Sequence, residues 1–302
     1  MVLFGADVSS YQGKFNVTVP ACGKKLDFVI AKATEGTNYV NPYCDYVLQQ
    51  AIKKKKPWGF YHYFTGVGYK QEVDCYLKNT WKGYGRKGLP CFDWESNSNA
   101  AFGDSSYLKN AVDYFHDKTG VWPVIYTTAS VAQTLDNTGI FKNCALWCAG
   151  YPYNNGSWNV PPFIYQLPKD VTMILWQFDS ANGLDKNVAY IDAKTWCKYC
   201  NPTSSSTNTK PVVNPQVVTL ELLAQDVIAG KYGSGNSRMQ KLGKYAQSVQ
   251  AIVNHKLNAI SFASCISTLK REAIRGNLGN GAERKHLLGS YYDSVQQSIN
   301  RG

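Results

Sequence analysis

Short apolar runs alternate with amphipathic stretches along residues 1–200. Runs rich in β-branched and aromatic residues are typical of buried strands, and we expect strands at Leu3–Val8, Phe28–Ala33, Trp58–Phe64, Leu89–Trp94, Val121–Thr127, Leu146–Gly150 and Ile174–Phe178. Apolar residues at helical spacing between them predict helices over Tyr43–Lys55, Tyr69–Trp81 and Ser106–Thr119. This alternation of strands and helices predicts a parallel α/β fold whose sheet is either closed as a barrel or open.

A second pattern occupies residues 218–302 and occurs twice. A shift of 46 residues superposes Gly230 on Gly276, Gly233 on Gly279, Gly235 on Gly281, Arg238 on Arg284 and Tyr245 on Tyr291. Each copy predicts a helix, a glycine-rich turn, a short helix and a further helix, with the helices of the first copy at Leu220–Ala229, Ser237–Gly243 and Tyr245–Asn254. We therefore expect two small all-α three-helix bundles, at 218–256 and 264–302.

The two patterns are separated by residues 201–217, which are rich in Ser, Thr, Asn and Pro and carry one charge, Lys210. Such a composition without an apolar period is typical of a linker. The sequence therefore predicts a domain at 1–200, a linker at 201–217 and two repeats.

Composition narrows the function. Of the 302 residues, 44% are hydrophobic and 18% are charged, which excludes wholesale disorder. No apolar run is long enough to cross a bilayer, so we do not expect a membrane-embedded protein. The formal net charge is +11, and residues 218–302 alone hold eleven Lys and Arg against five Asp and Glu. A basic balance suits nucleic acid, a membrane surface or an anionic polymer, but no nucleic-acid-binding motif is present.

The cysteines and the N-terminus bear on the compartment. The start of the chain reaches Asp7 without a basic region or a long apolar stretch, so it does not resemble a secretion signal. Nine cysteines, an odd number, then favour reduced thiols in a cytosol. Cys197 and Cys200 have Cys-x-x-Cys spacing, but a zinc site would need a second ligand pair that is not evident. We expect no metal and no cofactor.

Polar residues gather where the predicted strands end. In a parallel barrel all these ends open on one face, where active sites lie, and the residues concerned are Asp7, Lys32, Tyr61, Asp93, Glu95, Tyr126, Gln177 and Asp185. Several carboxylates among aromatic side chains are typical of a glycosidase site.

The segment Phe92-Asp93-Trp94-Glu95 carries the sharpest signal. Residues two apart on a strand point to the same side, so both carboxylates can face the barrel mouth. Two close carboxylates raise one pKa and leave a proton donor near neutral pH, and glycoside hydrolysis needs such an acid beside a second carboxylate. The alternative is two exposed acids that end a strand and cap the next helix.

Residues 1–200 resemble glycoside hydrolase family 25, the lysozymes of Chalaropsis type. The matching segments follow one another in family order: Asp7-Val8-Ser9-Ser10, Phe28–Glu35, Gly59–Tyr63, Phe92–Glu95, Val124–Tyr126, Leu146–Tyr151, Trp176–Phe178 and Asp185–Asn187. The resemblance implies an irregular (β/α) TIM-like barrel that cleaves the β-1,4 bond between N-acetylmuramic acid and N-acetylglucosamine.

The resemblance also implies roles for single residues. Glu95 would be the general acid, and Asp93 would stabilise positive charge or orient the substrate's N-acetyl group. Asp7 would tune the pair from the floor of the site. Asp185 would be the fourth acid, although Asp179 and Asp192 lie in the same region.

Four further residues are expected to contact substrate. They are Lys32, Tyr61, Tyr126 and Gln177. The alternative for the two tyrosines is core packing with a satisfied hydroxyl group. The alternative for Lys32 is a structural ion pair with Glu35 or Asp7.

The repeats resemble the CW-seven cell-wall-binding repeats of phage lysozymes, through Val227–Gly235 and Ala273–Gly281 with the residues that follow each turn. That family usually has Trp where this chain has Tyr232 and Leu278, which puts aromatic stacking there in doubt. The resemblance implies binding to the glycan or muropeptide of peptidoglycan, with Arg238 and Arg284 as candidate contacts. The alternative for both arginines is a structural role that holds a helix.

We therefore hypothesise a phage or prophage endolysin, a muramidase joined to a wall-binding region. It would stay in the host cytoplasm until a holin opens the membrane, and then act on the cell wall. Its positive charge would also favour anionic wall polymers, and the repeats could instead serve self-association. The alternatives are a non-catalytic peptidoglycan-binding lectin, a host autolysin of the same family, and an amidase or endopeptidase, which commonly needs zinc or a Cys/His pair.

Overall fold

The computed structural model describes residues 2–202 and 217–301, which form two compact units. The predicted linker, 201–217, lies outside the described residues except for Asn201, Pro202 and Val217.

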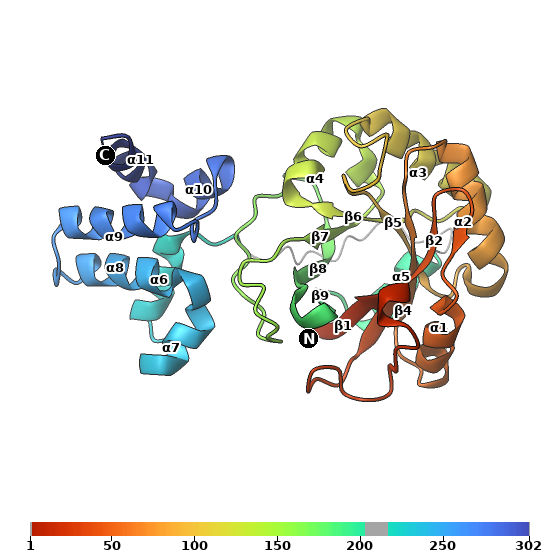
Figure 1. Ribbon diagram of the computed structural model, residues 1–302, viewed down its shortest axis with the longest axis horizontal. Helices are drawn as coiled ribbons and strands as arrows, with labels where there is room; N and C mark the ends of the chain where they lie inside the picture. Colours follow the sequence, from red (N-terminus) through yellow and green to blue (C-terminus); the bar gives the residue numbers. More distant parts are fainter. Residues whose placement is uncertain (1, 203–216, 302) are drawn as a thin grey trace. The chain divides into compact units, whose positions relative to one another are not determined.

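The first unit is a closed barrel of eight strands with one short strand added at its edge (Figure 1). The strands are β1 (Leu3–Val8), β2 (Phe28–Glu35), β3 (Tyr39–Val40), β4 (Trp58–Tyr63), β5 (Leu89–Asp93), β6 (Val124–Thr128), β7 (Leu146–Ala149), β8 (Met173–Asp179) and β9 (Asp185–Ala189). Parallel pairing runs from β1 through β2, β4, β5, β6 and β7 to β8. The barrel fold predicted from the sequence is therefore confirmed.

Two strands were not predicted, and one of them completes the barrel. β9 pairs antiparallel with both β1 and β8 and so closes the circle that parallel strands alone would leave open. β3 pairs antiparallel with the end of β2. Neither strand has the apolar run by which the others were predicted, because β9 has three polar residues among its five and β3 is only two residues long.

Five α-helices accompany the described strands of this unit: α1 (Cys44–Lys53), α2 (Tyr69–Tyr84), α3 (Ser105–Thr119), α4 (Ala129–Leu135) and α5 (Ala193–Cys200). The first three match the predicted helices to within a few residues, whereas α4 and α5 were not predicted. The indole of Trp196 on α5 donates to the carbonyl of Trp58 at 3.1 Å and packs against Phe28, 5.0 Å between ring centres. Because Phe28 and Trp58 begin their strands, α5 closes the end of the barrel opposite the site.

The second unit holds both repeats. Its helices are α6 (Leu220–Ile228), α7 (Gly235–Leu242), α8 (Ala246–Lys256), α9 (Phe262–Ile274), α10 (Gly281–Leu288) and α11 (Tyr292–Asn300). Each repeat supplies three helices, as predicted, and α8 packs on α9 so that the repeats share one body. This unit also takes in Asn159–Gln166, a segment that the sequence analysis places in the first domain.

The glycine-rich turns of the repeats have the backbone geometry that their sequence predicts. Gly230 and Gly233 have φ angles of +80° and +70°, and their counterparts Gly276 and Gly279 have +81° and +63°. These are left-handed conformations that side chains disfavour. Glycine at these positions is therefore required by the backbone.

No helix among residues 2–202 and 217–301 is long and apolar enough to span a membrane.

Candidate active site

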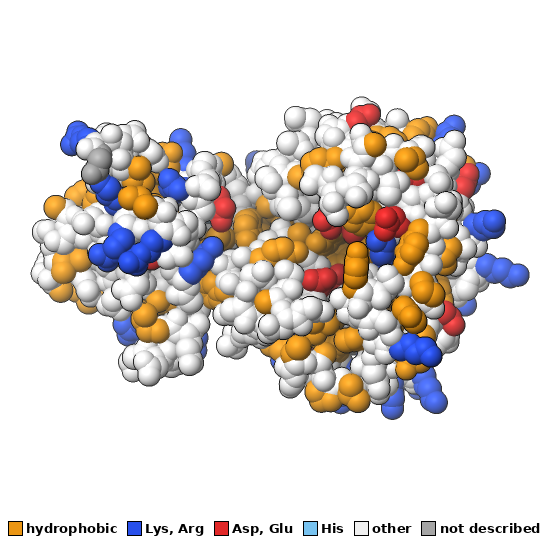
Figure 2. All heavy atoms as spheres, viewed as in Figure 1, with side chains coloured by type: hydrophobic (Ala, Val, Ile, Leu, Met, Phe, Trp, Pro, Cys, Tyr) orange, Lys and Arg blue, Asp and Glu red, His pale blue; other side chains and the backbone are white. Residues whose placement is uncertain are grey.

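Four acidic residues meet at the carboxyl ends of the parallel barrel strands. Asp7 lies near the end of β1, Asp93 ends β5, and Glu95 follows two residues later. Asp185 begins the antiparallel β9 and is therefore at the same edge, directly opposite Asp7 in the sheet register. Figure 2 shows acidic side chains gathered around a hollow in the barrel unit, with a basic side chain and hydrophobic side chains beside it.

Asp93 and Glu95 form the centre of this group. Asp93 is 6% exposed, and it lies close enough to Glu95 for the two carboxyl groups to affect each other's ionisation. Burial is the main cause that raises the pKa of both groups, and for Asp93 the charge of Glu95 raises it further. Two neighbouring buried carboxyl groups cannot both ionise cheaply, so the pair retains a proton and titrates as a unit.

Asp7 is fixed beneath this pair by two amides. Its Oδ1 accepts from Gln177 Nε2 at 2.7 Å and from Asn187 Nδ2 at 2.6 Å, and Asn187 in turn accepts from the indole of Trp147 at 2.7 Å. Burial, followed by the charge of Asp185, raises the pKa of Asp7 well above its ordinary value.

The structure distinguishes the three candidates for the fourth acid. Burial and the charge of Glu95 raise the pKa of Asp185 to about 6. Asp179 is instead paired with the buried Lys186 at 2.8 Å, and its other oxygen accepts from Gly156 N–H. Asp192 caps the N-terminus of α5 by accepting from Thr195 N–H, away from the strand ends. The geometry therefore favours Asp185.

Lys32 lies in the site but is held by a neighbour. Its ammonium group pairs with Glu35 and lies 4.4 Å from the centre of the Tyr63 ring. Its charge lowers the pKa of both Asp93 and Glu95, against the effect of burial. The ion pair with Glu35 supports the structural interpretation of Lys32, while its contact with substrate stays a prediction.

Gln177 and the tyrosines expected to contact substrate are largely buried. Gln177 Oε1 accepts from Tyr126 OH at 2.7 Å and from Tyr151 OH, which leaves its amide nitrogen for Asp7. Tyr61 is 8% exposed and packs edge-on against Trp147. For Gln177 and Tyr126 the contacts indicate residues that position Asp7.

Asn187 and Tyr151 were not predicted as site residues. Asn187 lies two residues after Asp185, the same spacing that was used to place Asp93 and Glu95 on one side of a strand. The signal was therefore present, but it could not be used because β9 was not predicted.

Comparison with known proteins agrees with this geometry. Residues 6–187 match Glycosyl hydrolases family 25, and residues 221–257 and 267–301 match the CW_7 repeat.

The chain belongs to glycosyl hydrolases family 25. It is a glycoside hydrolase that carries two CW_7 repeats. It is 28% identical to the lysozyme of Streptococcus phage Cp-7 over 266 residues, which cover 84% of this chain and 69% of that protein. It is 31% identical to the N,O-diacetylmuramidase of Chalaropsis sp over 157 residues, 46% of this chain and 72% of that enzyme.

A solved structure supports the same assignment. The family 25 lysozyme of Aspergillus fumigatus superposes with a TM-score of 0.54 at 26% identity, covering 66% of this chain and 99% of that one. The share of this chain that it covers corresponds to about the length of the barrel unit.

In the repeats of this family 25 enzyme, the two candidate arginines share one contact. Arg238 Nε donates to Gly233 O at 3.0 Å, and Arg284 Nε donates to Gly279 O at 3.0 Å. Arg238 also donates to Gln250 Oε1, and Arg284 donates to Asn280 Oδ1. Both guanidinium groups thus hold the glycine-rich turns, which supports the structural interpretation.

The cysteines offer no metal centre among the described residues, where no group of three or more His, Cys, Asp or Glu side chains could hold an ion. All nine are free thiols; Cys22 and Cys197 are exposed and the others are buried.

Proposed function

We propose that this family 25 enzyme is a muramidase, which cleaves the β-1,4 bond between N-acetylmuramic acid and N-acetylglucosamine in bacterial peptidoglycan. The observation that carries the proposal is the pair of neighbouring carboxyl groups, Asp93 and Glu95, at the barrel mouth, whose pKa values are both raised by burial. The names of the relatives, a phage lysozyme and a diacetylmuramidase, support the substrate class.

In the proposed reaction, Glu95 gives its proton to the glycosidic oxygen. The bond between that oxygen and the anomeric carbon breaks, its electron pair stays on the oxygen, and positive charge develops on the sugar. Water finally adds its hydroxyl to the anomeric carbon and returns a proton to the enzyme. The raised pKa of Glu95 suits this role, because an acid must still hold its proton at the working pH.

Asp93 acts beside this charge. Its Oδ1 is buried and has no hydrogen-bond partner among the described residues, so it is free to accept from the N–H of the substrate's acetamido group. This unpaired acceptor favours the orienting or charge-stabilising role for Asp93.

The decisive test is Glu95→Gln. General acid catalysis contributes on the order of 10²–10⁴-fold, so we expect a loss of that size in kcat on purified cell walls. Asp113→Asn, which alters an exposed carboxyl group on α3, is the matched control. Wild-type digests should contain new reducing sugar ends; new amino termini instead would refute the muramidase assignment and favour an amidase or endopeptidase.

We further propose that the enzyme is a phage or prophage endolysin, kept in the host cytoplasm until a holin releases it, and that its repeats bind the glycan or muropeptide. Full-length Glu95→Gln should sediment with intact walls without digesting them. Release by salt, and weaker binding after phosphate-rich polymers are removed, would identify anionic wall polymers as additional partners. Failure to sediment would leave self-association, measured by ultracentrifugation, as the role of the repeats.

The alternatives to the endolysin have their own tests. A lectin would bind walls and leave them intact even with Glu95 present. A host autolysin would share the chemistry but would need export from the cell that makes it, which fractionation of that cell would detect.

A further inference from the structure

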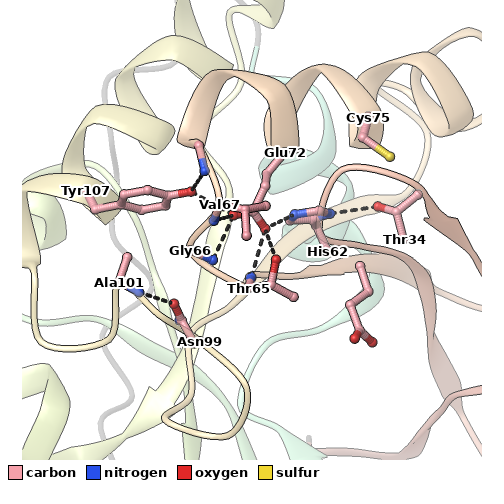
Figure 3. A network of polar contacts seen from close by, with 12 residues as sticks. Thr34, His62, Thr65, Gly66, Val67, Glu72, Cys75, Asn99, Ala101 and Tyr107 are labelled. Carbon is pink, nitrogen blue, oxygen red and sulfur yellow. Dashed lines mark hydrogen bonds and ion pairs between the residues drawn. The ribbon is translucent and has the colours of Figure 1, made fainter.

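A buried carboxylate outside the catalytic group has contacts on every side. Glu72 belongs to the first turn of α2 and is fully buried. Its Oε1 accepts from the backbone N–H groups of Gly66 and Val67, at 2.8 and 3.0 Å, and from Tyr107 OH at 2.7 Å. Figure 3 shows the carboxylate enclosed by these donors.

The other oxygen of Glu72 completes the set. Oε2 accepts from Thr65 N–H at 2.8 Å and lies 3.3 Å from His62 Nε2. His62 Nδ1 lies 2.8 Å from the hydroxyl of Thr34. Because burial lowers the pKa of His62, the ring is neutral, and one tautomer satisfies both contacts: Nε2–H donates to Glu72 while Nδ1 accepts from Thr34.

These donors keep Glu72 ionised. Burial alone would raise its pKa, but the hydrogen bonds from His62, Tyr107 and Thr65 N–H outweigh burial and lower it. A buried, fully satisfied carboxylate is rigid, and three consecutive backbone N–H groups, those of residues 65–67, are bound to it. Glu72 therefore clamps the turn that follows β4.

The clamped turn supports the segment that follows Glu95. Thr65 O accepts from Ala100 N–H at 2.9 Å, and Phe64 N–H donates to Asp93 O at 3.2 Å. At Gly66 the approach is so close that a Cβ would overlap the backbone nitrogen of Ala101. The turn after β4 and the chain from Asp93 to Ala101 are therefore packed backbone against backbone, with Glu95 between their points of contact.

We propose that Glu72 is a positioning residue for the general acid: through the turn at residues 65–67 it fixes the chain on either side of Glu95, and so the direction of the Glu95 carboxyl group. The inference rests on the proposed role of Glu95. It assigns Glu72 no contact with substrate and no proton transfer.

The substitution Glu72→Gln tests the clamp with little change in volume. A glutamine offers one acceptor oxygen where the turn presents donors to two, and its NH₂ group would face further N–H groups. The turn should therefore shift or loosen. Misplacement of a catalytic group by about 1 Å can cost as much as 10²-fold in rate, so we expect kcat to fall about tenfold or more, with KM on soluble peptidoglycan glycan strands changed less than about twofold.

Two further variants separate positioning from general destabilisation. Tyr107→Phe removes one donor and should give a smaller loss of kcat in the same sense. Thr80→Val is the matched control, because Thr80 is buried on the same helix and its hydroxyl bonds only the helix carbonyl of Tyr76. It should leave kcat unchanged per folded molecule, even if it lowers the melting temperature as much as Glu72→Gln.

Hydrogen exchange gives a readout that does not depend on activity. In Glu72→Gln the amides of residues 65–67 and of Ala100 should exchange faster, while those of the distant β7 should not. Unchanged exchange, or kcat within about twofold of the wild type, would overturn the inference. If Glu95→Gln instead retains activity, the proposed function fails, and faster exchange in Glu72→Gln would still show the clamp without a catalytic consequence.

Discussion

The barrel contains two groups of buried acids whose surroundings differ in one respect. Glu72 and Asp179 are as buried as Asp7 and Asp93, but each of the former is surrounded by donors or paired with a cation. The acids at the mouth lie near one another, with two amide donors on Asp7 and the charge of Lys32 as partial compensation, and their pKa values are raised. Burial is therefore common to both groups, and what distinguishes the proposed catalytic group is charge that the protein compensates only in part.

The comparison separates stability from catalysis. An acid with its full set of partners fixes the backbone and contributes to folding, and its loss leaves those partners exposed to an apolar interior. An acid held beside other acids costs stability, and in the proposed mechanism the proton that it retains is the one used in catalysis.

The largest effect on folding is expected from Asp179→Asn. This change leaves Lys186, which is fully buried, without its counter-charge, and breaking such a pair typically costs about 3–5 kcal/mol. The free energy of unfolding, measured with urea, should fall by that order. The kcat of molecules that remain folded should change much less. A free energy of unfolding that changes by less than about 1 kcal/mol would show that the pairing of Asp179 with Lys186 does not stabilise the fold.

Asp185→Asn, six residues later, is expected to stabilise the folded protein, by less than Asp179→Asn destabilises it. The pKa of Asp185 is raised to about 6 in the folded protein. The stability that its protonation contributes is therefore fully present below its pKa in the unfolded chain and is lost as pH rises through 6. Asparagine does not ionise, so the variant does not lose this stability. The melting temperature of the variant should therefore exceed that of the wild type at pH 7 and approach it toward pH 4, while activity falls. A lower melting temperature at pH 7 would place Asp185 with the compensated acids.

These two positions also show what could be predicted from the sequence. The parallel α/β fold and the strand-end acids followed from the apolar runs, and the barrel followed from the family resemblance carried by segments such as Phe92–Glu95. β9 did not, because Lys186 has the residue type of an exposed position and is buried only through its pairing with Asp179. The burial of Glu72 could not be predicted either, because an acid in the first turn of a helix is ordinary. It depends on the turn at residues 65–67, whose shape is set by packing, and on Tyr107, which is distant in sequence.

A smaller effect, on the pH dependence of activity, is expected at Lys32, which compensates the mouth acids only in part. The charge of Lys32 lowers the pKa of Asp93 and Glu95, but Lys32 is also paired with Glu35. Asp7 and Asp185 belong to the same group of acids. Lys32→Met should raise the pKa of the pair, so that Glu95 keeps its proton to higher pH. The basic limb of the kcat/KM profile should then move upward by about one pH unit. A limb that stays in place, or moves downward, would mean that Lys32 acts on substrate alone.

The smallest effect is expected in the repeats, where Arg238 is a compensated cation. Its guanidinium donates twice to Gly233 O and once to Gln250. Arg238→Lys keeps the charge but cannot reproduce this fork, so unfolding of the repeat should become easier by about 1 kcal/mol. Sedimentation of folded protein with purified walls should be unchanged, because the variant retains the positive charge.

Arg284→Lys is the internal control for that experiment, since Arg284 makes the matching bond to Gly279 O in the second repeat. If both arginines are structural, the two variants should lose similar stability and keep wall binding. If wall binding falls about tenfold in either variant while its unfolding is unchanged, the guanidinium of that repeat contacts the wall ligand. The rule that compensated charges serve the fold would then hold for the barrel and fail for the repeats.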